Sequence, residues 1–191
     1  MYPESVEELV TAPILEETGG EEAKFHGAGR EDIDARMLGT GRPFIVEVKN
    51  PKKRNIDLQK LQDKINQYAQ GKVEVHSLHF AVKEQVRQLK ALSQFAPKTY
   101  KAIVKVDREI TSEELKALEQ KLTGQTVRQK TPRRVAHRRA VKTRLKKVYE
   151  AHVNQVDPHT FELIVKCQGG LYVKELVTGD RRRTRPSVSE I

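Results

Sequence analysis

The segment GAGREDIDARMLGTGRP, residues 27–43, concentrates glycine around a short charged core that runs from Arg30 to Arg36. Glycine favours tight turns and positive-φ backbone, so the segment is too interrupted for a long helix. It is also too charged for a buried strand, and the pattern predicts a loop that presents carboxylates and guanidiniums together. Such loops are typical of binding or catalysis, but composition alone favours a solvated surface loop.

Segments with a clear hydrophobic period surround this loop on both sides. Helical spacing predicts helices over residues 5–15, 57–70, 84–95, 112–122 and 171–177. Alternation predicts strands over residues 43–49, 73–82, 98–106 and 161–167, and one or two exposed cationic strands over 133–149.

Local signals refine this pattern. Pro13 is expected to interrupt the first helix, and a change of face near Ser77 predicts a bulge in the strand over 73–82. Residues 179–191 are expected to form a charged tail. Helices and strands do not alternate strictly, which predicts an α+β fold with a mixed, largely antiparallel central sheet and flanking helices.

Length and composition indicate one globular domain over residues 1–191. No run of eighteen apolar residues and no signal peptide is evident, so we expect a cytoplasmic protein that does not enter a membrane. A single cysteine, Cys167, excludes an internal disulfide framework and a cysteine-based zinc cluster. The sequence therefore favours a metal-independent protein.

Charge is distributed unevenly along the chain. The first 22 residues contain seven glutamates and no Lys or Arg, whereas residues 127–149 contain ten Lys or Arg and no acid. This segment alone equals the net charge of +10 of the whole chain. Such a basic stripe indicates a polyanionic partner, and nucleic acid is the leading candidate. A solvated basic face is the alternative, and an anionic membrane is disfavoured because the stripe lacks a large apolar face.

Other chemistries find little support among the residues. The only close histidine pair, His76 and His79, would point to opposite faces of a strand, which disfavours metal ligation. No phosphate-binding Gly-x-x-x-x-Gly-Lys loop occurs, and Gly27-Ala28-Gly29 lacks the third glycine of a dinucleotide site. The remaining candidate is a loop carboxylate beside arginines, either Asp32 or Asp34.

Three stretches together resemble the signature motifs of pseudouridine synthases. Residues 29–32, Gly-Arg-Glu-Asp, resemble the Gly-Arg-x-Asp motif, and residues 98–102, KTYKA, resemble the lysine-x-tyrosine that opens a core strand. Residues 170–176, GLYVKEL, resemble the third motif, in which glycine and apolar residues lead to a basic side chain. Three ordered motifs are far more specific than any one of them.

The chain is most similar to the archaeal-type enzymes that make pseudouridines 54 and 55 in the T loop of tRNA. The longer family patterns occur at residues 25–38, 130–140 and 179–188, so the resemblance covers nearly the whole chain. It implies the pseudouridine synthase fold, tRNA as partner, modification of position 54, 55 or both, and chemistry without a cofactor.

The resemblance also implies roles for individual residues. Asp32 matches the essential nucleophile, Tyr100 would stack on the target uracil, and Lys174 would hold the aspartate ionised. Leu171 would line the uracil site, and Arg30 would fill the space that a flipped uridine leaves. Taken singly, Tyr100 reads as a core aromatic, Lys174 as a surface lysine and Arg30 as a loop ion-pair partner. The expected RNA-binding residues of the basic stripe are Arg133, Arg134, Arg138, Arg139, Lys142 and Arg144.

The chain departs from the family at several points. Family members usually carry an N-terminal RNA-binding domain with paired zinc-binding cysteines, which this sequence lacks. Two interpretations stay open, a catalytic-domain protein, with or without a separate RNA-binding chain, and a fragment. Val141 stands where an acid is expected, and Arg182 stands where a glycine is usual. A non-catalytic RNA-binding module, such as a tRNA chaperone, is the alternative function.

Overall fold

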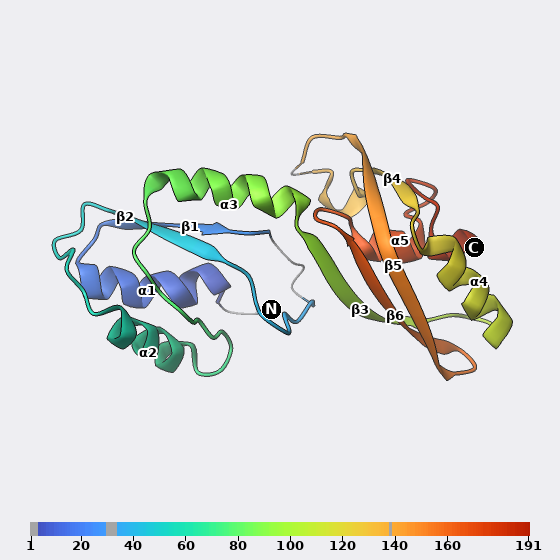
Figure 1. Ribbon diagram of the computed structural model, residues 1–191, viewed down its shortest axis with the longest axis horizontal. Helices are drawn as coiled ribbons and strands as arrows, with labels where there is room; N and C mark the ends of the chain where they lie inside the picture. Colours follow the sequence, from blue (N-terminus) through green and yellow to red (C-terminus); the bar gives the residue numbers. More distant parts are fainter. Residues whose placement is uncertain (1–3, 30–33, 138) are drawn as a thin grey trace. The chain divides into compact units, whose positions relative to one another are not determined.

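The computed structural model describes residues 4–29, 34–137 and 139–191, drawn as a ribbon in Figure 1. These residues form two compact units, the first ending at Leu92 and the second beginning at Ser93. Each unit has its own hydrophobic core.

The first unit contains a two-stranded antiparallel sheet and helices that pack against it. Its elements are α1 (Val6–Thr18), β1 (Glu22–Gly27), β2 (Phe44–Lys49), α2 (Leu58–Ala69) and α3 (Lys83–Phe95), which continues past the end of the unit. Val10 and Ile14 of α1 meet Leu61 and Ile65 of α2 in a buried cluster. Phe44, Val46 and Val48 pack against this cluster, which confirms the face predicted for β2.

Between β1 and β2, the described residues of the glycine-rich segment after Gly27, at 28–29 and 34–43, form neither helix nor strand. Gly27 pairs with Phe44 at the end of the ladder, and Ala28 N donates to Pro43 O over 3.1 Å. The loop therefore leaves and re-enters the sheet at one point. β1 itself was not predicted, although its six residues alternate between polar and non-polar, because the run is short and Ala23 and Phe25 are its only apolar side chains.

Two predictions for the first unit are wrong. Helix α1 continues through Pro13, because burial of Leu9, Val10 and Ile14, at about 1.5–3 kcal/mol for each large side chain, outweighs the ~3 kcal/mol cost of a helical proline. Residues 73–82 form no strand. The Asn66 side chain of α2 instead bonds both the N–H and the C=O of Val75, at 2.8 and 2.9 Å.

The second unit is built on a five-stranded antiparallel sheet in the order β3-β6-β5-β4-β7 (Figure 1). Helices α4 and α5 contribute Leu115, Leu118, Leu122 and Leu176 to the same buried cluster as the inward side chains of the strands. This architecture confirms the predicted α+β fold. The elements are β3 (Pro97–Lys105), α4 (Ser112–Leu122), β4 (Thr126–Lys130), β5 (Thr143–Asp157), β6 (Thr160–Gln168), α5 (Val173–Thr178) and β7 (Thr184–Arg185).

Two further predictions fail in this unit. The cationic strand predicted over 133–149 begins only at Thr143, because Arg133–Val135 form a short 3-10 helix instead. The predicted charged tail is folded: β7 pairs with β4, and a second 3-10 helix follows at Val188–Glu190. Both segments are stabilised by contacts with residues distant in sequence, and hydrophobic periodicity cannot predict such contacts.

Cys167 of β6 lies fully buried in the core of the second unit. Burial raises the pKa of its thiol to about 11, against smaller opposing effects of the Lys98 and Lys146 ammonium groups. We expect no reaction with a thiol reagent at pH 8 in the folded protein, and one equivalent after unfolding in urea. Because the folded-state pKa is raised, this thiol should lower the free energy of unfolding only as pH rises from about 9 to about 11. Rapid native labelling at pH 8 would contradict the burial.

Candidate functional site

The residues predicted to act together come from both units. Arg30, Asp32 and Arg138 lie outside the described residues. Asp34 lies in an exposed turn of the first unit, within the loop between β1 and β2. Tyr100 and the remaining predicted residues belong to the second unit, where their surroundings can be followed contact by contact.

Strand β3 and the start of α5 bring two of the predicted substrate residues to one cluster. Tyr100 on β3 pairs with Val165 of β6 and packs, half-buried, against the core that includes buried Leu171. Lys174 follows three residues later and is exposed in the first turn of α5. This half-buried position of Tyr100 is compatible with both expectations, a core aromatic from the residue type alone and a uracil-stacking residue from the family resemblance.

A buried glutamine holds the start of α5. Gln129 of β4 is 1% exposed, and its side chain accepts from Tyr172 N and donates to Tyr172 O, both at 2.9 Å. It also lies 3.4 Å from the Thr184 hydroxyl of β7. Since Tyr172 N-caps α5 without a side-chain cap of its own, Gln129 positions the turn that carries Lys174. Sequence reasoning missed Gln129, and the available signal was a polar residue at the inward position of Val127-Arg128-Gln129.

The same helix is held from a second side by an ion pair. Arg134 donates to both carboxylate oxygens of Glu175, over 2.7 and 3.3 Å. The carboxylate is almost fully buried, with 7% of the side chain exposed, whereas the Arg134 side chain is 35% exposed. This bidentate geometry is the strong form of an arginine–carboxylate contact. Arg134, expected to bind RNA, therefore also fixes α5.

The longer family patterns of the second unit lie against each other. Arg183 donates to Thr131 O over 2.6 Å, and the Asp180 carboxylate accepts from Arg133 N over 3.1 Å. Thr131 is fully buried, and its hydroxyl accepts from Lys142 N over 2.9 Å. Two segments about fifty residues apart in sequence are thus in direct contact, and comparison of motifs alone could not predict this contact.

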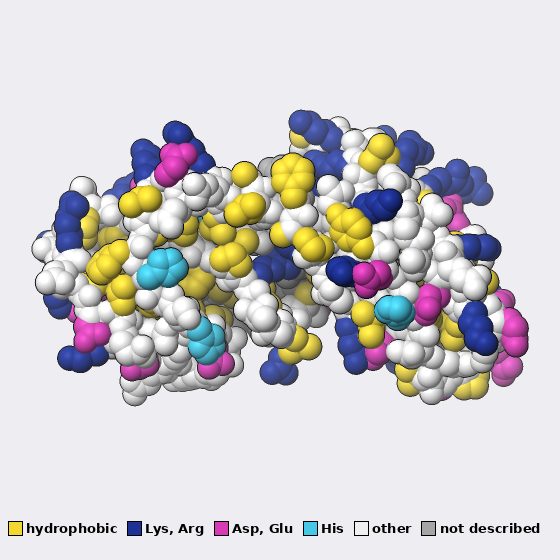
Figure 2. All heavy atoms as spheres, in the orientation of Figure 1, with side chains coloured by type: hydrophobic (Ala, Val, Ile, Leu, Met, Phe, Trp, Pro, Cys, Tyr) yellow, Lys and Arg dark blue, Asp and Glu magenta, His cyan; other side chains and the backbone are white. Residues whose placement is uncertain are grey.

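The basic stripe divides into cations with internal partners and cations that face outward. Arg139 donates to the Tyr172 hydroxyl over 3.1 Å, and Arg144 donates to the Thr131 hydroxyl over 3.0 Å. Lys146 donates to Gly169 O over 2.7 Å, and desolvation, aided by nearby Arg144, lowers the pKa of its ammonium group. In Figure 2, Lys and Arg side chains gather around β4 and the connection to β5, and acidic side chains gather around α4.

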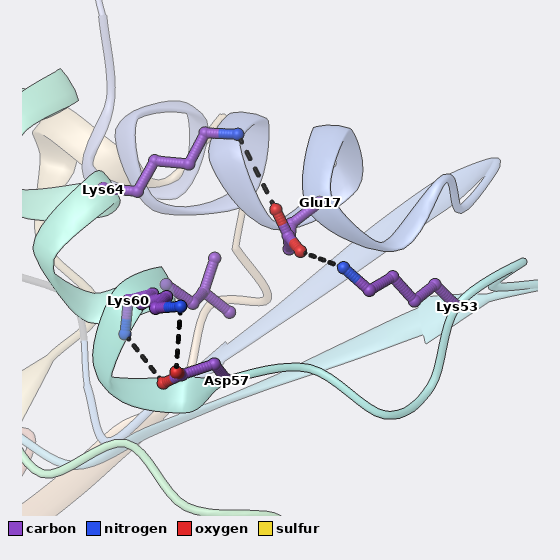
Figure 3. A pocket seen from close by; sticks show the side chains of 6 residues that line it. Glu17, Lys53, Asp57, Lys60 and Lys64 are labelled. Carbon is purple, nitrogen blue, oxygen red and sulfur yellow. Dashed lines mark hydrogen bonds and ion pairs between the residues drawn. The ribbon is translucent and has the colours of Figure 1, made fainter.

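A cavity of about 350 Å³ in the first unit holds none of the predicted residues. Figure 3 shows Glu17 between Lys53 and Lys64, and Lys60 beside Asp57. Lys53 Nζ lies 2.6 Å from the Glu17 carboxylate, and Lys64 Nζ lies 4.0 Å from it. Three lysines and two carboxylates line the cavity, and Lys64 also lies 3.1 Å from Glu16 outside the lining, so the lining charges are largely paired within the fold.

In the part of the chain that the structure describes, no group of three or more His, Cys, Asp or Glu side chains is arranged to hold a metal ion. Nor does any helix there have the length and apolar character needed to cross a membrane.

Comparison with known proteins places the whole chain. The family model described as Pus10, C-terminal, matches residues 1–191. This chain belongs to that family. It is 54% identical over 192 residues to the protein named tRNA pseudouridine synthase Pus10 of Methanocaldococcus jannaschii, covering 100% of this chain and 41% of the relative. Proteins of the same name from Methanothermobacter marburgensis and Methanothrix thermoacetophila are 50% and 48% identical, and the match covers 100% of this chain with 46% and 42% of theirs.

The chain thus spans a little under half the length of these curated Pus10 relatives. The family model covers both structural units, including the glycine-rich loop and the contacting patterns of the second unit. The archaeal resemblance read from the motifs is confirmed by the archaeal relatives.

In this Pus10 C-terminal chain, Arg182 has φ of +65°, in the left-handed region that favours glycine. This explains why a glycine suits the position. Arg182→Gly should raise the free energy of unfolding, measured in urea, by about 0.5–1 kcal/mol, since a left-handed non-glycine residue is strained. Arg182→Ala is the control: it removes the same charge but keeps the Cβ atom. An equal gain in both variants would assign the effect to charge instead of backbone.

Proposed function

We propose that this chain is the catalytic part of a tRNA pseudouridine synthase that isomerises uridine at position 54, 55 or both of the T loop. One observation carries the proposal: the family match extends over all 191 residues, and a relative named tRNA pseudouridine synthase Pus10 is 54% identical to the chain. The two units together would form the catalytic domain. The outward-facing cations of the second unit support a tRNA partner.

Asp32 acts as the nucleophile in this proposal. The reaction breaks the bond between uracil N1 and ribose C1′, turns the base and joins C1′ to C5. A carboxylate suits the work because it can attack, or assist attack, at either the sugar or the base and then leave again. No external energy source is needed, since the base is only reattached through a different atom.

The other site residues prepare the base and the carboxylate. The glycosidic bond is inaccessible in a stacked loop, so the uridine flips out, and Arg30 occupies the space it leaves. Tyr100 stacks on the flipped uracil and assists removal of the C5 proton, and Leu171 lines the apolar side of the same pocket. Lys174 keeps the Asp32 carboxylate ionised. Gln129 and Glu175 would support this arrangement by holding the turn from which Lys174 projects.

The direct test is incubation of the chain with unmodified tRNA, followed by chemical mapping of pseudouridine. We expect modification confined to the T loop, without added metal or cofactor. Tight tRNA binding with no pseudouridine would favour the alternative, a non-catalytic RNA-binding module. Modification outside the T loop would keep the enzyme class and change its substrate position.

The connection between β4 and β5 is proposed to contact the tRNA backbone. Replacing Arg138, Arg139 and Lys142 with glutamine should weaken tRNA binding and reduce the slope of log K against log salt by about 2, since each phosphate contact contributes about 0.7–0.9. Fluorescence titration at several salt concentrations measures both quantities. An unchanged slope would place the RNA elsewhere.

A further inference from the structure

The ladder formed by β7, β4 and β5 has two chemically distinct faces. On the inner face, Val127 and Gln129 are buried, and their cross-strand partners Lys146 and Arg144 bond to Gly169 O and the Thr131 hydroxyl. These two cations are committed to the fold. Their alternation along the strands leaves a different set of residues on the outer face.

The outer face carries three exposed cations, Arg128, Lys130 and Lys147. Within the described part of the chain, the side chains of these three cations make no hydrogen bond or ion pair, and only the backbone N of Lys147 bonds to a side chain, that of Gln168 over 3.3 Å. Arg128 has Arg185 directly opposite on one side and Leu145, 66% exposed, on the other. Only Arg185 has an acidic partner, Glu190 at 2.9 Å.

Like charges directly opposite each other on neighbouring strands destabilise a sheet. Glu190 compensates the charge of Arg185, whereas Arg128 has no such partner among the described residues, so an external anion would relieve the repulsion that remains at Arg128. The positive surface also continues beyond the ladder, because Lys130 N donates to Arg183 O over 2.9 Å and brings the exposed Arg181-Arg182 turn beside it.

This face points away from the helices of the second unit. Leu176 of α5 and Leu122 of α4 pack with Val127 on the inner face, so Arg128 and Lys130 lie on the opposite side of the sheet. The cross-strand partners of the three cations are threonine, leucine and arginine, and the exposed aromatic nearest to them along β5 is a single tyrosine, Tyr149, 37% exposed. Backbone contact therefore suits this face better than stacking on unpaired bases, which needs aromatic platforms.

We propose that Arg128, Lys130 and Lys147 form a second phosphate-binding surface that takes the sugar-phosphate backbone of a base-paired stem of the substrate RNA. The surface is distinct from the connection between β4 and β5 and would contact RNA away from the reacting uridine. The inference rests on the proposed function for its choice of polyanion, since charge complementarity alone defines the partner as a phosphate backbone.

The test compares two triple variants of the full chain. The outer-face variant is Arg128→Gln, Lys130→Gln, Lys147→Gln. The control is Lys105→Gln, Lys116→Gln, Lys121→Gln, which removes the same charge from exposed positions near the end of β3 and on α4 of the same unit. Binding of unmodified tRNA and of a plain RNA duplex is titrated across salt concentrations, and circular dichroism checks that both variants fold.

The outer-face variant should lose about 2–3 from the magnitude of the slope of log K against log salt with both RNAs, while the control keeps the wild-type slope. Equal salt slopes in the two triple variants would overturn the proposal of a second phosphate-binding surface. So would an unchanged RNA slope with lost binding to vesicles rich in anionic lipid, because the partner would then be a membrane.

Pseudouridine mapping in parallel separates this inference from the proposed function. If the wild type modifies tRNA and the salt slope of the outer-face variant is unchanged, the proposed enzyme activity stands and the proposed phosphate-binding surface is refuted. If the slope of that variant falls but the wild type makes no pseudouridine, the surface stands and the enzyme activity is refuted.

Discussion

Asp32→Asn should abolish pseudouridine formation, lowering the rate by about 10⁴-fold or more, the scale seen when an enzyme loses its nucleophile. Asparagine has nearly the same shape as aspartate but lacks the negative charge and the lone-pair nucleophilicity of a carboxylate. Binding of tRNA should stay within about threefold of the wild type, since phosphate contacts supply most of the affinity. Single-turnover mapping of pseudouridine, alongside a binding titration, measures both effects.

Asp34→Asn is the matched control, because it makes the same chemical change two residues away in the same loop. We expect activity of this variant within about tenfold of the wild type. An active Asp32→Asn would remove the nucleophile assignment. Loss of activity in Asp34→Asn alone would transfer the role to the other carboxylate of the loop.

Arg134→Leu should lower the free energy of unfolding by about 2–3 kcal/mol. The substitution leaves the Glu175 carboxylate buried without its bidentate partner, and such uncompensated charges cost several kcal/mol. The expected loss of stability is at or below the low end of the range usual for a broken buried ion pair, because the Arg134 side chain is 35% exposed and water can reach the Glu175 carboxylate in the variant. Urea unfolding measures the loss. The turn of α5 that carries Lys174 should loosen with it, seen as faster hydrogen exchange there.

Two further variants test the physical cause. Arg133→Leu removes a neighbouring arginine whose backbone, and not its side chain, bonds to Asp180, so it should cost less than about 0.5 kcal/mol. The double variant Arg134→Leu, Glu175→Leu removes both charges and should recover most of the loss, because apolar pairs of similar volume replace buried ion pairs well. No recovery in the double variant would mean that Arg134 acts through packing instead of charge.

Hydrophobic period predicted most elements because their buried faces follow one strand or helix repeat. Leu115, Leu118 and Leu122 face the core of the second unit at helical spacing, and Val104 lies on the predicted face of β3. Prediction failed where backbone groups find side-chain partners distant in sequence. Val75 bonds to Asn66 instead of a neighbouring strand, although its segment is rich in β-formers.

The residues of the candidate site likewise include some that a local sequence pattern reveals and some that it does not. Motif matching selected Tyr100, Leu171 and Lys174 directly from the sequence, since these residue types stand at the family positions. It did not select Gln129, which becomes meaningful only because the fold buries its amide against Tyr172. Burial and remote hydrogen bonds are properties of the folded chain, so no local pattern encodes them visibly.

The α+β class, the family and the concentration of ten cations in one segment without acids could all be predicted from the sequence. These are properties of composition, hydrophobic period and motif. The contacts of each cation, by contrast, depend on the folded structure. Cross-strand register turns Arg144 and Lys146 inward to internal acceptors and leaves Arg128 and Lys130 outward. Neighbouring residues of a strand face opposite sides, so one uniform basic stripe becomes structural support on one face and an exposed cationic surface on the other.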